Sequence, residues 1–154
     1  MYRFYLDTIE RKMSYAYLSE AFFEMMCSDF RHRIVLFMAR RDSQWVAGAI
    51  HYRKGARLYG RYWGCLEHHP YLHFELCYYR AIEYAIEQGI ALVEAGAQGP
   101  QKALRGFLPS AVHSAHWIAD ENFRDAIGRY VLAEAGEVEA VIESEHYDSY
   151  NARC

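Results

Sequence analysis

The chain has 154 residues, with 17 Lys and Arg against 20 Asp and Glu, 53% hydrophobic residues and 24% charged residues. This composition excludes disorder and fibrous repeats and is typical of a single globular domain over residues 1 to 154. The slightly acidic balance also argues against a DNA-binding protein, which needs a strongly basic face. Two clusters of cations leave room for a local basic groove: Arg31, Arg33, Arg40 and Arg41, and Arg53, Lys54, Arg57 and Arg61.

Apolar side chains recur at helical spacing through residues 1 to 30, which predicts two helices there. Ser19 is a candidate cap for the second helix. From residue 32 to residue 63, short apolar runs are separated by turn residues at Asp42-Ser43 and Lys54-Gly55. This pattern predicts an antiparallel meander of three strands.

Residues 71 to 88 carry the clearest helical pattern, introduced by Pro70 and closed by Gly89. The predicted apolar side of this helix consists of Phe74, Tyr78, Ala81, Ile82, Ala85 and Ile86. Residues 90 to 93 then predict a short buried strand. Since a helix connects it to the meander, the strand is expected to complete a strand-helix-strand crossover.

Residues 112 to 118 predict a further strand, and Asp120 is expected to cap a long helix over residues 120 to 147, with Gly136 as a bend. The apolar stripe of that helix would be Phe123, Ile127, Tyr130, Val131 and Val138. This order of elements, with residues 71 to 118 as helix, strand, loop and strand, predicts an α+β fold. A mixed, mostly antiparallel sheet would be flanked by helices.

Glu75 is the most unusual residue of the helix at 71 to 88. On a helical wheel it falls inside the apolar arc, between Ile82 and Ile86, where a carboxylate needs a partner or a cleft. One interpretation places it at the mouth of a cleft, as a general base or an anchor for an amine, with His73 as its partner or as the base itself. The other starts the helix later, so that Glu75 lies in the first turn and favours the positive end of the helix dipole.

The loop Gly96-Ala97-Gln98-Gly99 follows the strand at 90 to 93. Its backbone N–H groups would form a phosphate cradle, to which Lys102 and Arg105 add positive charge; an ordinary turn is the alternative. No metal site is expected, because no histidine spacing is typical of zinc sites.

The four cysteines form no C-x-x-C pair, so the sequence predicts reduced thiols rather than a zinc site or a disulfide framework. Residues 1 to 10 contain no apolar signal segment, and the chain has no run of 18 apolar residues. We therefore expect a cytoplasmic chain without a membrane span.

Several motifs resemble those of a known family: LYGRYWGC at 58 to 65, LHFELCYY at 72 to 79, IEYAI at 82 to 86, GAQG at 96 to 99, RGFLP at 105 to 109 and SAHW at 114 to 117. The family consists of bacterial predicted N-acyltransferases of the GNAT superfamily, which are labelled peptidoglycan biosynthesis or recognition proteins. It is similar to the Fem-type peptidyltransferases, which transfer amino acids from aminoacyl-tRNA to cell-wall precursors. Members are longer, and this chain resembles their C-terminal half.

The resemblance implies a GNAT-like acyltransferase fold and the transfer of an activated acyl or aminoacyl group to an amine on a small molecule or cell-wall peptide. Glu75 or His73 would take the proton of the amine. The donor or acceptor would be held by Arg61, Tyr62, Gln98, Lys102 and Arg105.

An acyl-CoA or an aminoacyl-tRNA would serve as co-substrate, without a tightly bound cofactor. The segment from 65 to 73 lacks the glycine-rich pyrophosphate loop of acetyl-CoA users. The alternative function is a non-catalytic recognition or assembly module that keeps the fold and binds a cell-wall peptide, a lipid-linked precursor or another protein. Three explanations are open for the missing half: the chain is a fragment, a short paralogue, or one protomer of a homodimer that replaces it.

Overall fold

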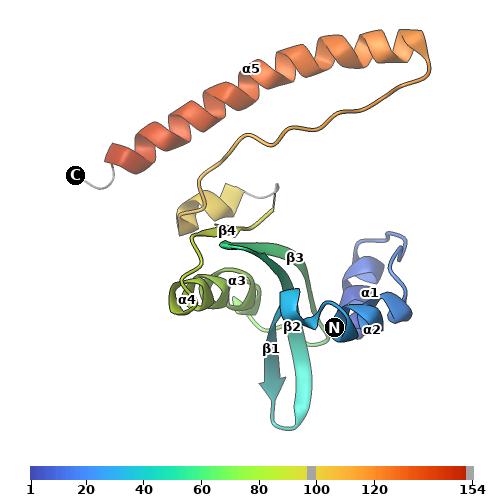
Figure 1. The fold of residues 1–154 in the computed structure, drawn as a ribbon, viewed down its shortest axis with the longest axis vertical. Coiled ribbons are helices and arrows are strands. Elements are labelled where there is room, and N and C mark those ends of the chain that lie inside the picture. Colours follow the sequence, from blue (N-terminus) through green and yellow to red (C-terminus); the bar gives the residue numbers. More distant parts are fainter. Residues whose placement is uncertain (97–99, 152–154) are drawn as a thin grey trace. The chain divides into compact units, whose positions relative to one another are not determined.

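The computed structural model describes residues 1–96 and 100–151 (Figure 1). The chain divides into two compact units, Met1–Gln98 and Gly99–Cys154. The first unit contains a β-sheet with helices on both of its faces, and the second contains a short helix and a long one (Figure 1).

Two helices begin the first unit, as predicted: α1 (Tyr2–Arg11) and α2 (Glu20–Ser28). The Ser19 hydroxyl accepts a hydrogen bond from the Phe22 N–H at 3.3 Å, which confirms the predicted cap. The buried phenol oxygen of Tyr5 accepts from the N–H groups of Tyr17 and Leu18, at 3.0 and 3.2 Å. The loop between the helices is therefore anchored to α1.

The predicted meander forms after a short helical turn, η1 (Arg31–Arg33). Its strands are β1 (Ile34–Arg41), β2 (Gln44–Lys54) and β3 (Arg57–Cys65), paired antiparallel. The turns use left-handed backbone at Asp42 and Gly55, with φ of 53° and 58°. The register shifts between Ala39 and Arg40 and between Ile50 and His51, as in β-bulges, which bend strands and redirect side chains.

The helix predicted over 71 to 88 forms in three parts: α3 (Leu72–Phe74), a π-helical segment η2 (Glu75–Tyr79), and α4 (Arg80–Glu87). Gly89 ends it with a φ of 61°, as its position predicted. The next strand, β4 (Leu92–Glu94), starts two residues later than predicted and pairs parallel with β3. The predicted crossover is thus confirmed.

The sheet has the strand order β1-β2-β3-β4, with α1 and α2 on one face and α3, η2 and α4 on the other (Figure 1). On the α4 side, Leu58 of β3 is fully buried against Ala81 and Ala85, whose small side chains let the helix approach closely. On the α1 side, the ring of Tyr5 packs on Phe23 with 5.5 Å between centroids. The fold is α+β with a mixed sheet flanked by helices, as predicted.

Not all of the predicted apolar side of the α4 region is buried. Tyr78, Ala81 and Ala85 lie in the core, whereas Ile86 is 76% exposed. At α-helical spacing, Ile86 lies about 100° around α4 from Ala85 and about 140° from Ala81, so a helix packed on these two alanines leaves it outside the core. The π-helical segment, whose turn holds one residue more, displaces Phe74 and Glu75 from their places on the same wheel. A wheel drawn at 100° per residue from Phe74 to Ile86 therefore assigns some positions to the wrong side.

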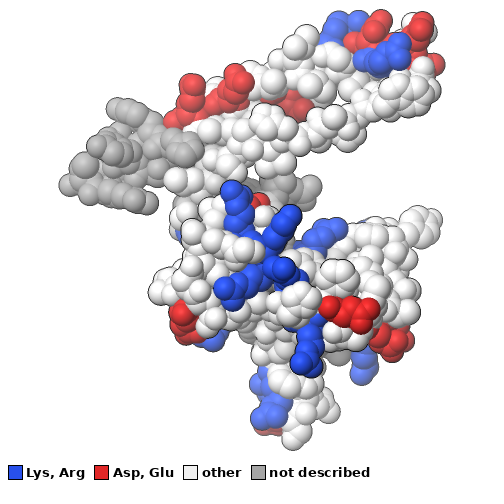
Figure 2. Space-filling model, viewed as in Figure 1, with Lys and Arg blue, Asp and Glu red and all other residues white. Residues whose placement is uncertain are grey.

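Basic side chains are concentrated on the first unit, whereas acidic ones predominate along the visible face of α5 in the second (Figure 2). In the sheet, Lys54 lies directly opposite Arg57. Arg31 and Arg33 precede β1, whose first residue pairs with Tyr52 of β2. One end of the sheet therefore carries several exposed cations.

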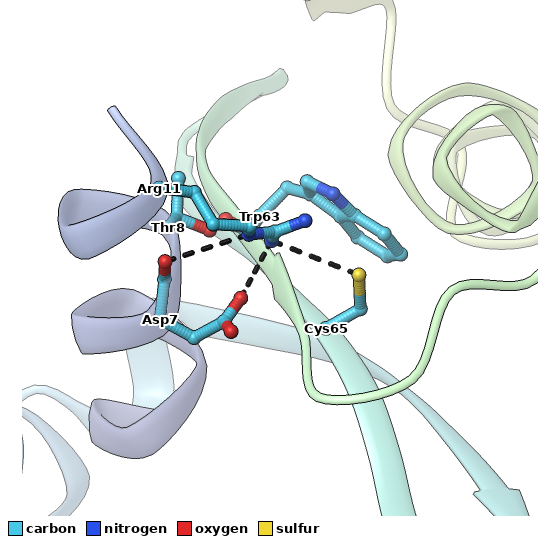
Figure 3. Close-up of polar contacts among 5 residues, drawn as sticks. All are labelled: Asp7, Thr8, Arg11, Trp63 and Cys65. Atoms are coloured by element: carbon cyan, nitrogen blue, oxygen red, sulfur yellow. Dashed lines mark hydrogen bonds and ion pairs between the residues drawn. The ribbon is translucent and has the colours of Figure 1, made fainter. Parts of the chain in front are cut away.

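Polar contacts join α1 to β3 (Figure 3). The Thr8 hydroxyl donates to the backbone carbonyl of Trp63 at 2.8 Å. The Arg11 guanidinium forms an ion pair with Asp7 at 2.6 Å and donates to the Cys65 sulfur at 3.7 Å. These contacts run beside Gly64, where a Cβ would lie 1.9 Å from the carbonyl oxygen of Phe4. Helix and strand thus meet backbone to backbone.

The second unit contains η3 (Pro100–Arg105) and α5 (Glu121–Asn151). The Asp120 carboxylate accepts from the Phe123 N–H at 2.8 Å, which confirms the predicted cap. The strand predicted over 112 to 118 is wrong, because these residues pair with no strand and their side chains are mostly exposed. The segment contains the apolar residues Val112, Trp117 and Ile118, but it forms no ladder with a strand in the described part of the chain.

At Gly136, where a bend was predicted, α5 continues as a helix. One glycine costs a helix about 1 kcal/mol, which the flanking Ala135 and Glu137 can offset. In the predicted stripe of α5, Phe123, Tyr130, Val131 and Val138 are exposed and Ile127 is half-buried. Among the described residues, no helix has the length and hydrophobicity needed to cross a membrane.

Candidate functional site

An open pocket of about 470 Å³ lies in the first unit, between the β1–β2 hairpin and the start of the helical segment. The hairpin contributes Ala39, Arg40, Arg41 and Val46, and the segment after β3 contributes His69, Pro70, Tyr71, Leu72, Glu75 and Tyr79. Its volume falls within the range of small-molecule sites, roughly 300 to 1,000 Å³.

The backbone around the pocket adopts two uncommon conformations. Tyr71 has a φ of 66°, a left-handed conformation that non-glycine residues rarely adopt. In η2, the Arg80 N–H donates to the carbonyl of Glu75, five residues earlier, as in a π-helix. Such conformations cost free energy and are found frequently at functional sites. Here they present Glu75 to the pocket instead of to the apolar core.

The charges that line the pocket are only partly compensated. Arg41 forms an ion pair with Glu67 at 2.8 Å, and Glu67 also lies 3.2 Å from Nε2 of His69. The guanidinium of Arg40 lies over the ring of Trp45, 5.8 Å from its centroid, without an acidic partner in the described part of the chain. Glu75 likewise has no cationic partner among the described residues. The pocket therefore presents one uncompensated cation and one uncompensated anion.

Of the two predicted catalytic residues, Glu75 lines the pocket and His73 does not. The imidazole of His73 is half-buried among aromatic rings. Its centroid lies 5.4 Å from those of Trp63 and Phe74 and 5.6 Å from that of Tyr78. His73 thus packs against β3, while Glu75 faces the open site.

Arg61 and Tyr62, predicted to bind substrate, lie on β3 and face α1. The Arg61 guanidinium lies 4.4 Å from the centroid of the Tyr62 ring and donates to the hydroxyl of Tyr17 at 3.2 Å. The Tyr62 ring packs against Tyr5 of α1 at 5.3 Å. Burial, followed by its hydrogen bond with Tyr17, raises the pKa of Tyr62 well above its usual range. The sheet separates this pair from Glu75.

The remaining predicted binding residues belong to other parts of the chain. Gln98 lies outside the described residues. Lys102 and Arg105 lie on η3 in the second unit, where Arg105 donates to the Gln101 carbonyl at 2.7 Å. Burial lowers the pKa of Lys102. Of the four predicted site residues that the structure describes in the first unit, Glu75 lines the pocket, whereas His73, Arg61 and Tyr62 do not.

The sequence analysis missed the two arginines of the pocket as site residues, because it grouped them only as a basic cluster. Alternation along a regular strand would point Arg40 and Arg41 to opposite faces. The register shift after Ala39 breaks this alternation, and both residues line the pocket. No local pattern in the sequence predicts that register shift.

A buried histidine behind η2 was also missed. The Nε2–H of His51 donates to the carbonyl of Cys77 at 3.4 Å, in the middle of the π-helical segment. Burial lowers the pKa of His51 to about 4. Within the described part of the chain, its Nδ1 has no hydrogen-bond partner. A signal was present, because His51 alternates with Ala47 and Ala49, which also face the core.

Comparison with protein families gives a match over residues 1–151 to the FemAB-like model, described as peptidoglycan biosynthesis/recognition. No curated protein matches the chain. Among the described residues, no group of three His, Cys, Asp or Glu side chains is placed to hold a metal ion.

Proposed function

The chain belongs to the FemAB-like peptidoglycan biosynthesis/recognition family, and we propose that it transfers an activated acyl or aminoacyl group to an amine of a cell-wall peptide. A GNAT-like version of the observed α+β fold is part of this proposal. The supporting observation is that Glu75, predicted as a general base from the sequence, lines an open pocket of substrate size.

The chemistry requires a proton acceptor beside the amine. The acceptor binds as an ammonium ion next to Glu75, whose carboxylate takes one proton and leaves a nucleophilic lone pair. The nitrogen attacks the donor carbonyl, the new C–N bond forms, and the bond from the carbonyl carbon to the leaving oxygen or sulfur breaks. The leaving group accepts a proton as it departs.

The donor is proposed to be an aminoacyl-tRNA or an acyl-CoA. Both carry several phosphates, and exposed cations at one end of the sheet suit such polyanions. Lys54 and Arg57 lie opposite each other there, although Glu94 pairs with Arg57 at 2.9 Å. This surface supports a phosphorylated donor without distinguishing between the two.

A transfer assay tests the proposal. The protein would be incubated with a muropeptide and either a radiolabelled aminoacyl-tRNA or a radiolabelled acyl-CoA, and labelled peptide would be counted. We expect Glu75→Gln to lower the rate by about 100-fold or more, the contribution of a general base. Glu87→Gln, an exposed residue of α4 away from the pocket, is the matched control and should leave the rate unchanged. A Glu75→Gln variant with full activity would refute the proposal.

A recognition module is the second candidate. The observation that favours it is the separation of the predicted residues, with Glu75 on one side of the sheet and Arg61 and Tyr62 on the other. Such a module would bind muropeptide in a calorimeter without transferring label from either donor. A homodimer remains a prediction for either function, and sedimentation would test it.

A further inference from the structure

We propose that the pocket recognises an amine whose own carbon carries a carboxylate, as in the head group of an amino acid, with Glu75 binding the ammonium and Arg40 binding the carboxylate. This inference rests on the proposed function only for the statement that the bound amine is the acceptor. The binding itself needs no catalysis.

Charge complementarity is the first support. Both residues line the same pocket, yet their charged groups are not within the 4.0 Å of an ion pair, and neither has another charged partner among the described residues. A ligand between them would therefore meet a cation on one side and an anion on the other. A simple alkylamine would satisfy Glu75 alone, and a simple carboxylate would satisfy Arg40 alone.

The second support is that the other cation of the pocket is already compensated. Arg41 is bonded to Glu67 through both of its terminal nitrogens, at 2.8 and 3.1 Å. This two-point geometry holds Arg41 in place and balances its charge. Arg40 is then the guanidinium that can bind a ligand carboxylate without breaking an ion pair.

The third support is the apolar part of the lining. Val46, Pro70 and Leu72 contribute aliphatic surface, and Tyr71 and Tyr79 contribute aromatic surface. Polar groups that fix orientation within an apolar wall are typical of small-molecule sites. An unbranched aliphatic chain beyond the charged head would lie against this wall.

Three probes of nearly equal size test the contributions of the ligand's ammonium and carboxylate to binding one at a time. Norleucine carries both, norleucinamide lacks the carboxylate charge, and hexanoate lacks the amine. Binding would be measured on the full chain by ligand-observed NMR at millimolar concentrations. We expect norleucine to bind about fivefold more tightly than either of the others, since an ion pair at an open site contributes up to about that factor. Equal affinity for the three probes, or no binding of norleucine, would overturn the inference.

Two variants assign each charge to its residue. Arg40→Gln should abolish the preference for norleucine over norleucinamide, and Glu75→Gln should abolish the preference for norleucine over hexanoate. Arg3→Gln and Glu87→Gln, exposed residues of α1 and α4, should keep both preferences. Circular dichroism would verify the fold of each variant. If each pocket variant weakened all three probes equally, the pocket would sense shape rather than charge, and the assignment would fail.

The results distinguish this inference from the proposed function. Selective binding of norleucine without transfer from either donor would retain the inference and reject the transferase. Transfer that depends on Glu75, together with equal binding of the three probes, would retain the transferase and reject the inference.

Discussion

The imidazole of His51 combines deep burial with an incomplete set of hydrogen bonds. It is 2% exposed, and only its Nε2 has a partner among the described residues. Protonation of Nδ1 would place a charge without a hydrogen-bond acceptor in a buried site, where the imidazole packs on the Phe37 ring with 5.1 Å between centroids. The folded state therefore keeps this histidine neutral.

This burial predicts a loss of stability in mild acid. The pKa of His51 is about 4 in the folded chain, against 6.5 for an ordinary histidine. Between these values the unfolded chain binds a proton that the folded chain does not, so the free energy of unfolding falls as pH falls through this window. From about pH 7 to about pH 5, urea titrations should show a loss on the order of 2 kcal/mol from this group.

A variant without the imidazole isolates the effect. His51→Gln keeps a donor near the Cys77 carbonyl but does not titrate, so its stability should depend less on pH in that window than that of the parent chain. The exposed residue His32 provides the control, because His32→Gln should retain the pH dependence of the parent. If His51→Gln matched the parent at both pH values, the proposed role of burial would be wrong.

The cysteines should differ sharply in reactivity. Burial raises the pKa of the Cys77 thiol to about 12, whereas Cys27 is exposed on α2. Because the thiolate is the nucleophile, iodoacetamide at about pH 8 should modify Cys27 much faster than Cys77. Mass spectrometry of the proteolytic peptides would measure both rates, which should converge in denaturant. Similar rates in the folded chain would contradict the burial of Cys77.

At the scale of elements, the contact between α1 and β3 depends on the absence of a side chain at Gly64. A Cβ there would lie 1.9 Å from the Phe4 carbonyl oxygen and 2.9 Å from its Cβ. To relieve this clash, α1 would have to move away from the strand, which would weaken the hydrogen bond from Thr8 to Trp63. We expect Gly64→Ala to lower the free energy of unfolding by about 3 kcal/mol, at the upper end of typical overpacking costs.

Urea titration would measure this loss of stability for Gly64→Ala, and Gly136→Ala provides the matched comparison. An added Cβ at this position meets no atom within 4 Å, and the residue lies in the interior of α5. Gly136→Ala should therefore stabilise its helix by up to about 1 kcal/mol. If the two alanine substitutions change the free energy of unfolding in opposite directions, the space around each glycine decides the outcome. If Gly64→Ala leaves the free energy of unfolding unchanged, α1 is not held against β3.

Elements whose formation depends on residues close by in the sequence could be predicted. Caps at Ser19 and Asp120, the turn at Asp42 and the helix end at Gly89 all use local backbone chemistry, and each forms where expected. The sequence could not predict the π-helical segment, because its wider turn leaves the apolar spacing ambiguous. It also could not exclude a strand over 112 to 118, since strand formation depends on a partner elsewhere in the chain.

At the scale of the whole chain, the candidate chemistry is distributed over both faces of the sheet. Glu75 reaches its pocket from the helical side, while Arg61 and Tyr62 face α1. The sequence drew attention to Glu75, because a carboxylate in an apolar arc is locally anomalous, and this residue lines the pocket. It could not reveal Arg40 as its counterpart, since the two residues come to the same pocket only through the packing of the hairpin on the helical segment.

The division into two units predicts where a protease cuts first. Residues 110 to 117 carry no helix or strand, and all of them are exposed, with Trp117 at 83%. In the sheet unit, by contrast, Phe4 and Tyr5 are nearly fully buried. Since proteases need an extended, accessible backbone, brief treatment with chymotrypsin should cut first after Trp117. Mass spectrometry should then show a lasting fragment that contains the whole sheet.

Trp117→Ala serves as the control for that cut. It should slow the first cleavage without changing the positions of the other cuts, because the side chain is exposed and contributes little packing. Far-UV circular dichroism of the purified fragment should retain the β-sheet signal, since both buried core clusters lie within residues 47 to 90. Early cuts inside β1, β2 or β3 would mean that the sheet unit depends on the second unit for its stability. The four-stranded sheet would then not be the independent body that its contacts indicate.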